Sequence, residues 1–186
     1  MEEDYIIDDL INEKPKKKKI KSGKKGNRGE LEIVKILNER FSKIISETPG
    51  IGSFSRSVGS GNRWGQKVDL SEAAKKVYSG DLTVPTNFLF TIESKNGYDD
   101  IDLMSAFSGK CKGLEDFLDQ VTNDAERVGR KPLLVWKKTR KPRVAFLRSK
   151  DWKKKGSTMF FFKGWVALPL EELLEKTRDD FWFEIN

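Results

Sequence analysis

The sequence contains no histidine and only one cysteine, Cys111, among its 186 residues. The absence of histidine excludes histidine general bases, histidine metal ligands and every catalytic triad that depends on an imidazole. One cysteine cannot form a disulfide within the chain, which either favours a reducing compartment or gives no signal on the compartment. Because no histidine is present to activate the thiol, we do not expect a cysteine nucleophile either.

Long apolar runs are also absent, and no segment approaches the length needed to cross a bilayer. The first residues are acidic, unlike a secretory signal. We therefore expect no membrane association and a cytoplasmic location, in a prokaryotic cell or a phage-infected host. Hydrophobic residues make up 37% of the chain, enough for the core of one domain with a tail.

Charge is unevenly distributed along the chain, whose formal net charge is +7. Residues 1–13 hold six acids and no base, whereas residues 14–28 hold nine bases and no acid. We interpret residues 1–27 as a flexible, disordered arm and residues 28–186 as the folded domain. A concentrated basic segment suits a polyanion, so Lys24, Lys25 and Arg28 are candidates for nucleic-acid binding. A merely solvated tail is the simpler reading, and the two are compatible.

Hydrophobic periodicity predicts an α/β fold, with a mixed central sheet flanked by helices. The predicted helices cover residues 28–41, 70–78 and 113–129, and a last one follows Pro169. The predicted strands cover residues 81–85, 88–95, 133–137, 143–147, 159–162 and 165–168.

The segment DLTVPTNFLFTIESKN, residues 81–96, carries charges at both ends of a hydrophobic stretch. Asp81 opens the first predicted strand, and Glu93 and Lys95 lie near the end of the second. Since side chains alternate along a strand, Glu93 and Lys95 share one face. Taken alone, they indicate a common surface ion pair. If the two strands are neighbours, however, Asp81 and Glu93 lie together at one end of the sheet. That arrangement favours a catalytic site over a surface ion pair.

Glu30 is the third carboxylate of interest. Helical spacing places it on the inward face with Ile33, Leu37 and Phe41, whereas Glu32 points outward. A buried carboxylate is costly unless it is paired or binds a metal, and the predicted helix N-terminus nearby helps to stabilise its charge. Oxygen ligands without histidine select a hard cation, Mg²⁺ first and Mn²⁺ as the alternative. Such an ion can activate water and balance charge on an attacked phosphate.

Five segments occur in the order found in PD-(D/E)XK nucleases, and they most resemble the archaeal-type and phage-type Holliday junction resolvases. These segments are GNRGELEIVKIL (26–37), SGN (60–62), SGDL (79–82), TIESKN (91–96) and DQVTNDAERVGRKPLLVWK (119–137). The resemblance covers about residues 24–148 and implies a restriction-endonuclease-like core. The chain departs from the pattern at Gly80, where the family has proline. The interval before Asp81 is also long and holds another acid, Asp69.

The resemblance also implies roles for individual residues. The residues matching the family's catalytic set are Glu30, Asp81, Glu93, Lys95 and Gln120. In the family the three carboxylates bind Mg²⁺ with the backbone carbonyl between the Glu and the Lys, here that of Ser94. The Ser-Gly loop of the resolvases matches Ser60. A resolvase implies a homodimer, because symmetric cleavage of two strands needs two sites related by a twofold axis.

The Gly/Ser-rich segment 50–67 supplies further candidates for binding nucleic acid. They are Arg56, Arg63, Trp64 and Lys67. Bases and an aromatic on a loop can hold a backbone and stack on an opened base, but an ordinary solvated loop with Trp64 packed on the body is an equal alternative. A second basic cluster at a predicted hairpin could extend the phosphate-binding surface. It consists of Lys137, Lys138, Arg140, Lys141 and Arg143.

The function that these features favour is a Mg²⁺-dependent endonuclease resolving branched DNA, as in recombination and repair. One alternative keeps the fold and changes the substrate, giving a restriction-like or RecB-like nuclease on duplex or DNA ends. The other is a DNA-binding protein with the same fold that no longer cuts. Comparing junction with duplex cleavage separates the first alternative, and a metal-dependent nicking assay separates the second.

Overall fold

A five-stranded mixed sheet forms the centre of the protein in this computed structural model, which describes residues 22–57, 79–152 and 159–185. The strands, in the order β3-β4-β5-β7-β6, are β3 (Phe90–Asn96), β4 (Lys131–Lys137), β5 (Arg143–Arg148), β7 (Trp165–Pro169) and β6 (Phe160–Phe162). Strands β3 and β4 are parallel, and the other neighbours are antiparallel. The predicted mixed sheet is therefore confirmed, and β3 is one of its edge strands.

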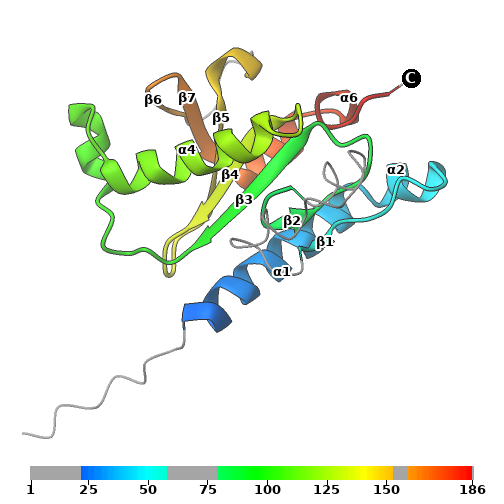
Figure 1. Ribbon diagram of the computed structural model, residues 1–186, viewed down its shortest axis with the longest axis horizontal. Coiled ribbons are helices and arrows are strands. Elements are labelled where there is room, and N and C mark those ends of the chain that lie inside the picture. The colour runs from blue at the N-terminus through cyan, green and yellow to red at the C-terminus, as the bar shows by residue number, and fades with distance from the viewer. Residues whose placement is uncertain (1–21, 58–78, 153–158, 186) are drawn as a thin grey trace, which may run out of the picture.

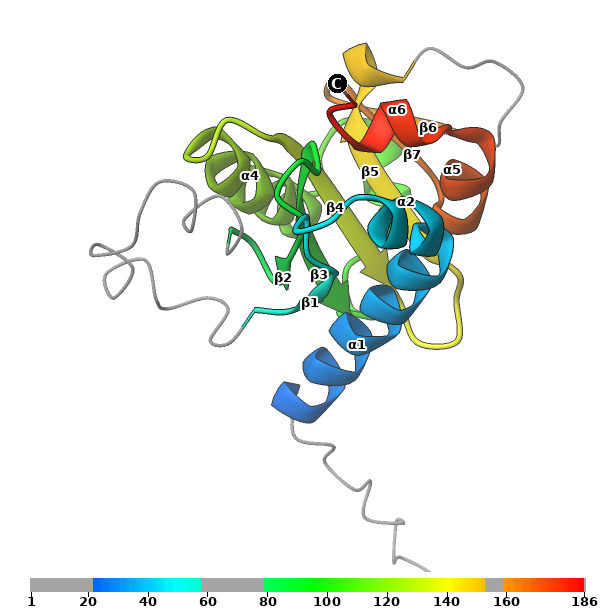
Figure 2. The same ribbon diagram turned by 90° about the vertical axis from the view of Figure 1, so that its right-hand side faces the viewer.

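Helices cover both faces of the sheet, with α1 and α4 on opposite sides (Figure 1). The main helices are α1 (Ser22–Arg40), α4 (Lys112–Glu126) and α5 (Leu170–Lys176). The short elements are α2 (Ser42–Glu47), α6 (Asp179–Trp182) and the 3-10 helices Leu103–Ser108 and Ser149–Asp151. Figure 2 shows α5 and α6 on the same side as α1. No helix in the described part of the chain is both long and apolar enough to cross a membrane.

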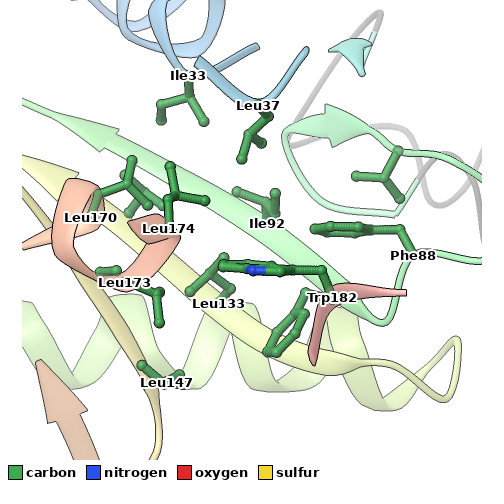
Figure 3. Close-up of a cluster of buried hydrophobic side chains, with 14 of the residues drawn as sticks. Ile33, Leu37, Phe88, Ile92, Leu133, Leu147, Leu170, Leu173, Leu174 and Trp182 are labelled. Atoms are coloured by element: carbon green, nitrogen blue, oxygen red, sulfur yellow. The ribbon is translucent and has the colours of Figure 1, made fainter. Parts of the chain in front are cut away.

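Two hydrophobic cores result, one on each side of the sheet. On the α1 side, the helical stripe of Ile33 and Leu37 packs over Ile92 and Leu133, with Trp182 closing the end (Figure 3). On the α4 side, the stripe of α4 packs over Leu134 and Trp136 and their neighbours. The stripe consists of Leu114, Phe117, Leu118, Val121 and Ala125. Four tryptophans, Trp136, Trp152, Trp165 and Trp182, are buried in these cores.

The region before β3 differs from the sequence-based expectation. Residues 81–85 form only the two-residue strand β2 (Leu82–Thr83), which pairs antiparallel with β1 (Ser55–Arg56) in a separate small sheet. Figures 1 and 2 both place this small sheet beside α1 and β3. A single parallel bridge between Gly80 and Ile92 connects the segment to the main sheet. Asp81 is therefore held at the free edge of β3 without a full neighbouring strand.

Helix α1 also starts earlier than predicted, at Ser22 rather than about residue 28. Part of the segment assigned to the arm is thus helical, with Lys24 and Lys25 in the first turns. The rest of the predicted arm and the predicted helix 70–78 lie outside the described residues.

Candidate active site

Asp81 is fixed against β3 by its own backbone and by its side chain. Gly80 has φ +79, and a Cβ at this position would lie 2.6 Å from the Ile92 carbonyl oxygen, so only glycine allows this close approach. The Asp81 amide donates to the Ile92 carbonyl at 3.0 Å, and the Ser94 amide donates to Asp81 Oδ2 at 2.9 Å. This contact explains why glycine stands where the resembling family has proline, and it places the buried Asp81 carboxylate beside Glu93.

Glu93, Lys95 and Gln120 form a connected triangle on the α4 side of the sheet. Lys95 Nζ donates to Glu93 Oε1 at 2.5 Å and to Gln120 Oε1 at 2.9 Å. Gln120 Nε2 donates to the same Glu93 oxygen at 2.6 Å. Glu93 is 1% exposed, and the Lys95 ammonium also lies 5.2 Å from the ring centroid of Phe117. The strand alternation that placed Glu93 and Lys95 on one face is confirmed.

Glu30 is buried on the inward face of α1, as the helical spacing predicted. Its charge partner is Arg56 of β1, whose Nε lies 2.5 Å from Glu30 Oε2. The helix N-terminus does not supply this partner, because α1 begins eight residues earlier and the helix dipole acts only within the first turn. Arg56 also donates from Nη2 to Asn27 Oδ1 at 3.0 Å. Sequence reasoning missed Asn27, whose only signal is its position one helical turn before Glu30.

Burial and mutual repulsion perturb the carboxylates. Desolvation, together with the charge of Asp81, raises the pKa of Glu93 to about 8. Desolvation also raises the pKa of Asp81, and the nearby Glu30 charge adds to this effect. Burial alone would lower the pKa of Lys95, but the Glu93 carboxylate outweighs it and the pKa is raised. Burial and the repulsion between the carboxylates thus disfavour their charged forms, although Lys95 and Arg56 lie beside them.

Glu32 does not simply point outward, contrary to the expectation from helical spacing. It is half-buried and pairs with Lys137 at 3.0 Å, with Arg143 and with the largely exposed Arg28 at 3.1 Å. The hydrogen bond from Lys137 is the main cause of a lowered pKa for Glu32. Lys137 and Arg143 of the predicted basic cluster therefore pair with Glu32 and connect α1 to the sheet.

Of the remaining predicted site residues, some lie beside Glu93 and Lys95 and the others lie outside the described residues. Gln120 lies beside Lys95, and the Ser94 backbone lies between Glu93 and Lys95 on β3. The side chain of Ser94 faces away from Glu93, and its buried Oγ has no hydrogen-bond partner. The predicted DNA-binding residues Ser60, Arg63, Trp64 and Lys67 and the alternative acid Asp69 lie outside the described residues.

The donor set fits a hard divalent cation, although its members are engaged with one another. In the described parts of the chain, no group of three acids or cysteines is arranged to hold a metal ion as it stands. Arg56 is paired with Glu30, and Lys95 is paired with Glu93. The carboxylate oxygens of the adjoining Asp81 and Glu93 are donors of the kind that hard divalent cations prefer.

A mixed sheet carrying an acid and a Glu-x-Lys at one edge, beside an inward Glu on the first helix, defines the PD-(D/E)XK nuclease superfamily. The chain matches the model of the family described as "Phage putative PDDEXK endonuclease" over residues 21–164. This match covers most of the chain, so the protein belongs to this nuclease family. No curated protein and no solved structure matches the chain significantly.

Proposed function

We propose that the protein is a Mg²⁺-dependent endonuclease that hydrolyses phosphodiester bonds in branched DNA. The observation that carries the proposal is the convergence of Asp81, Glu93 and Lys95 at the free edge of β3. Glu30 approaches the same place from α1, closely enough for its charge to act on Asp81. The family match supports nuclease chemistry, and the basic character of the chain suits DNA.

In this proposal, Glu30, Asp81 and Glu93 hold the metal through their carboxylates, with the Ser94 backbone carbonyl as a fourth donor. A bound divalent cation would lower the pKa of water and balance the negative charge of the attacked phosphate. The amide of Ser94 fixes Asp81, and the bridge at Gly80 fixes the backbone on which Asp81 stands. The position of the Asp81 carboxylate is therefore set by its contacts with the edge strand β3.

Lys95 and Gln120 act on the substrate side. An ammonium group has three N–H donors, and Glu93 and Gln120 accept two of them. Within the described part of the chain no hydrogen bond uses the third, and we assign it to a water or to an oxygen of the scissile phosphate. Gln120 orients Lys95 through its carbonyl and Glu93 through its amide, so we assign it a positioning role.

A homodimer belongs to this proposal, because two symmetric cuts need two sites. The surface best suited to a second copy surrounds β6, the edge strand far from the active site. Met104 and Phe107 are exposed there, and Phe107 contacts Phe160 beside an apolar cavity of about 340 Å³. Sedimentation of the wild type should show a dimer, and Phe107→Ser should shift it towards monomer. A wild-type monomer that still cuts junctions on both strands would contradict this part.

The decisive experiment is a panel of labelled DNAs, comprising a four-way junction, a flap and a linear duplex, incubated with Mg²⁺, with Mn²⁺ and with chelator. We expect cleavage of the junction at low enzyme concentration, only with metal, and much slower cleavage of the duplex. Equal cleavage of the duplex would replace branched DNA by the restriction-like alternative. Binding without cleavage of any substrate would leave only the DNA-binding alternative.

The site residues have a prediction of their own. Asp81→Asn and Glu93→Gln should each lower the cleavage rate by about 10³-fold or more, because each removes a metal ligand, while DNA binding is kept or tightened. Glu39→Gln is the matched control, since Glu39 is an exposed acid on α1 with a weak partner, Lys35, at 3.7 Å. Wild-type cleavage by either site variant, measured on the junction, would show that the metal site lies elsewhere.

A further inference from the structure

Arg56 forms an ion pair with Glu30, a carboxylate that the proposed metal site needs. Its guanidinium contacts Glu30 Oε2 through Nε and Asn27 Oδ1 through Nη2. The backbone of Arg56 pairs with that of Leu82, the residue that follows Asp81. The amide of the next residue, Ser57, donates a hydrogen bond to the Asp81 carbonyl at 3.0 Å. Arg56 is thus anchored beside Asp81 and reaches across to α1. Arg56 thus connects the strand that holds Asp81 with the Glu30 carboxylate of α1.

The pair differs from an ordinary structural ion pair in the same protein. Arg40, also on the α1 side, bonds through Nε, Nη1 and Nη2 to Leu174, Asp179 and Thr177, so every nitrogen of its guanidinium has a partner. Arg56 Nη1, in contrast, has no partner among the described residues. The Glu30 side chain is 9% exposed, but that of Arg56 is 32% exposed. The Glu30 carboxylate is therefore buried, whereas about a third of the Arg56 side chain is exposed among the described residues.

We propose that Arg56 is a positioning residue that makes metal binding depend on DNA. In the free protein, Arg56 neutralises Glu30 and competes with the cation for it. When DNA binds, the guanidinium turns to a backbone phosphate, for which its fork of N–H donors is well suited. Glu30 is then released to join Asp81 and Glu93. The inference rests on the proposed nuclease function and adds to it a reason why the enzyme would hold its metal weakly until substrate is present.

The coupling must be reciprocal, because two ligands that share one equilibrium affect each other equally. If DNA strengthens the binding of the metal by a given factor, the metal strengthens the binding of DNA by the same factor. Couplings of this kind usually amount to about 5–150-fold. Part of any increase in metal affinity on adding DNA would come from DNA phosphates that contact the ion directly. The wild type must therefore be compared with a variant in which Arg56 cannot neutralise Glu30.

The test measures the affinity for Mn²⁺ by electron paramagnetic resonance, with and without a saturating non-hydrolysable junction, on the full chain. We expect about tenfold tighter Mn²⁺ binding in the wild type when DNA is added. Arg56→Gln should bind Mn²⁺ more tightly than the wild type without DNA, and DNA should then add only the part that comes from phosphates in contact with the ion. Arg56→Lys, which keeps the charge, should restore weak binding in the absence of DNA. Arg40→Gln is the matched control and should behave as the wild type.

The outcomes separate this inference from the function on which it rests. If the wild type binds neither Mn²⁺ nor DNA, the proposed function fails. If both bind but Arg56→Gln leaves the Mn²⁺ affinity and its dependence on DNA unchanged, only the role of Arg56 is overturned. Thermal unfolding of each variant shows whether the fold is intact. A folded Arg56→Gln protein with weaker Mn²⁺ binding than the wild type would also overturn the proposal, because it would make Arg56 a support for the site rather than a competitor.

Discussion

Protonation of Glu93 links the chemistry of the site to the stability of the metal-free protein. Its pKa is raised to about 8 from the ordinary value of 4.5. Between pH 4.5 and about pH 8, Glu93 therefore keeps a proton in the folded state that it releases in the unfolded chain. The stabilisation is therefore complete below about pH 4.5 and is lost as the pH rises through about 8.

In chelator, the free energy of unfolding should accordingly fall by a few kcal/mol between pH 5 and pH 8.5, roughly 1.4 kcal/mol for each unit of pKa shift that is realised. Urea titrations at several pH values measure this dependence. Glu93→Gln should flatten the profile, because the amide does not titrate. With Asp81→Asn, the decrease in the free energy of unfolding should end at a lower pH, because the substitution removes the charge that helps to raise the pKa of Glu93. A profile that rises over this range would contradict the assigned burial of Glu93.

Gly80 gives a second test at the residue scale. Gly80→Ala should lower the stability by about 1–3 kcal/mol for the positive φ alone, with an additional loss from the contact with the Ile92 carbonyl. Gly50→Ala is the matched control, since Gly50 has φ +80 but an added Cβ would meet nothing within 4 Å. Chemical denaturation of both variants isolates the cost of the contact. Equal losses in the two proteins would mean that the Asp81 segment is not held tightly against β3.

The inward position of Glu30 and the shared face of Glu93 and Lys95 could be predicted from sequence, because helix and strand periodicity fix them. The partner of Glu30 could not be predicted. Arg56 reaches it from 26 residues away, through a two-residue strand whose sequence has no periodicity to detect. The same limit applies to Glu32, whose partners Lys137 and Arg143 lie 105 and 111 residues away in the sequence.

At the scale of elements, the long periodic segments were predictable and the short ones were not. Strands β4 and β5 and helix α4 follow their hydrophobic patterns closely, because each buries its own apolar residues. Strands β1 and β2 and helices α2 and α6 contain two to six residues each. Segments of this length are fixed by tertiary contacts, such as the bridge between Phe88 and Phe183, rather than by local preference.

The attachment of α1 to the sheet is a prediction at this scale. Glu32 connects α1 to β4 and β5 through Lys137 and Arg143. Glu32→Gln should lower the stability by about 1–3 kcal/mol, because charge-assisted hydrogen bonds are lost and two cations are left facing an amide. The exposed Glu39 on the same helix is the control, and Glu39→Gln should cost less than about 0.5 kcal/mol. Similar effects of the two substitutions on urea denaturation would show that the Glu32 cluster does not anchor the helix.

At the scale of the whole molecule, the distribution of charge decides how the protein meets DNA. Residues 1–13 carry six negative charges, and residues 14–21 carry six positive ones. Removing residues 1–13 raises the formal net charge from +7 to +13, whereas removing residues 1–21 leaves it at +7. The two truncations therefore separate the effect of total charge from the effect of the local basic segment, and both keep α1, which begins at Ser22.

We expect the shorter truncation to bind junction DNA more tightly than the full chain, since acids that compete with phosphates for the basic segment are gone. The longer truncation should bind more weakly than the full chain despite its equal net charge, and log Kd should depend less steeply on log salt, because fewer counterions are released. The loss should be about equal for junction and duplex, since backbone contacts carry no information on shape or sequence. Fluorescence anisotropy at several salt concentrations measures both slopes. If the longer truncation kept the full salt dependence, DNA would be bound by the folded domain alone, and the six lysines of residues 14–21 would have no part in it.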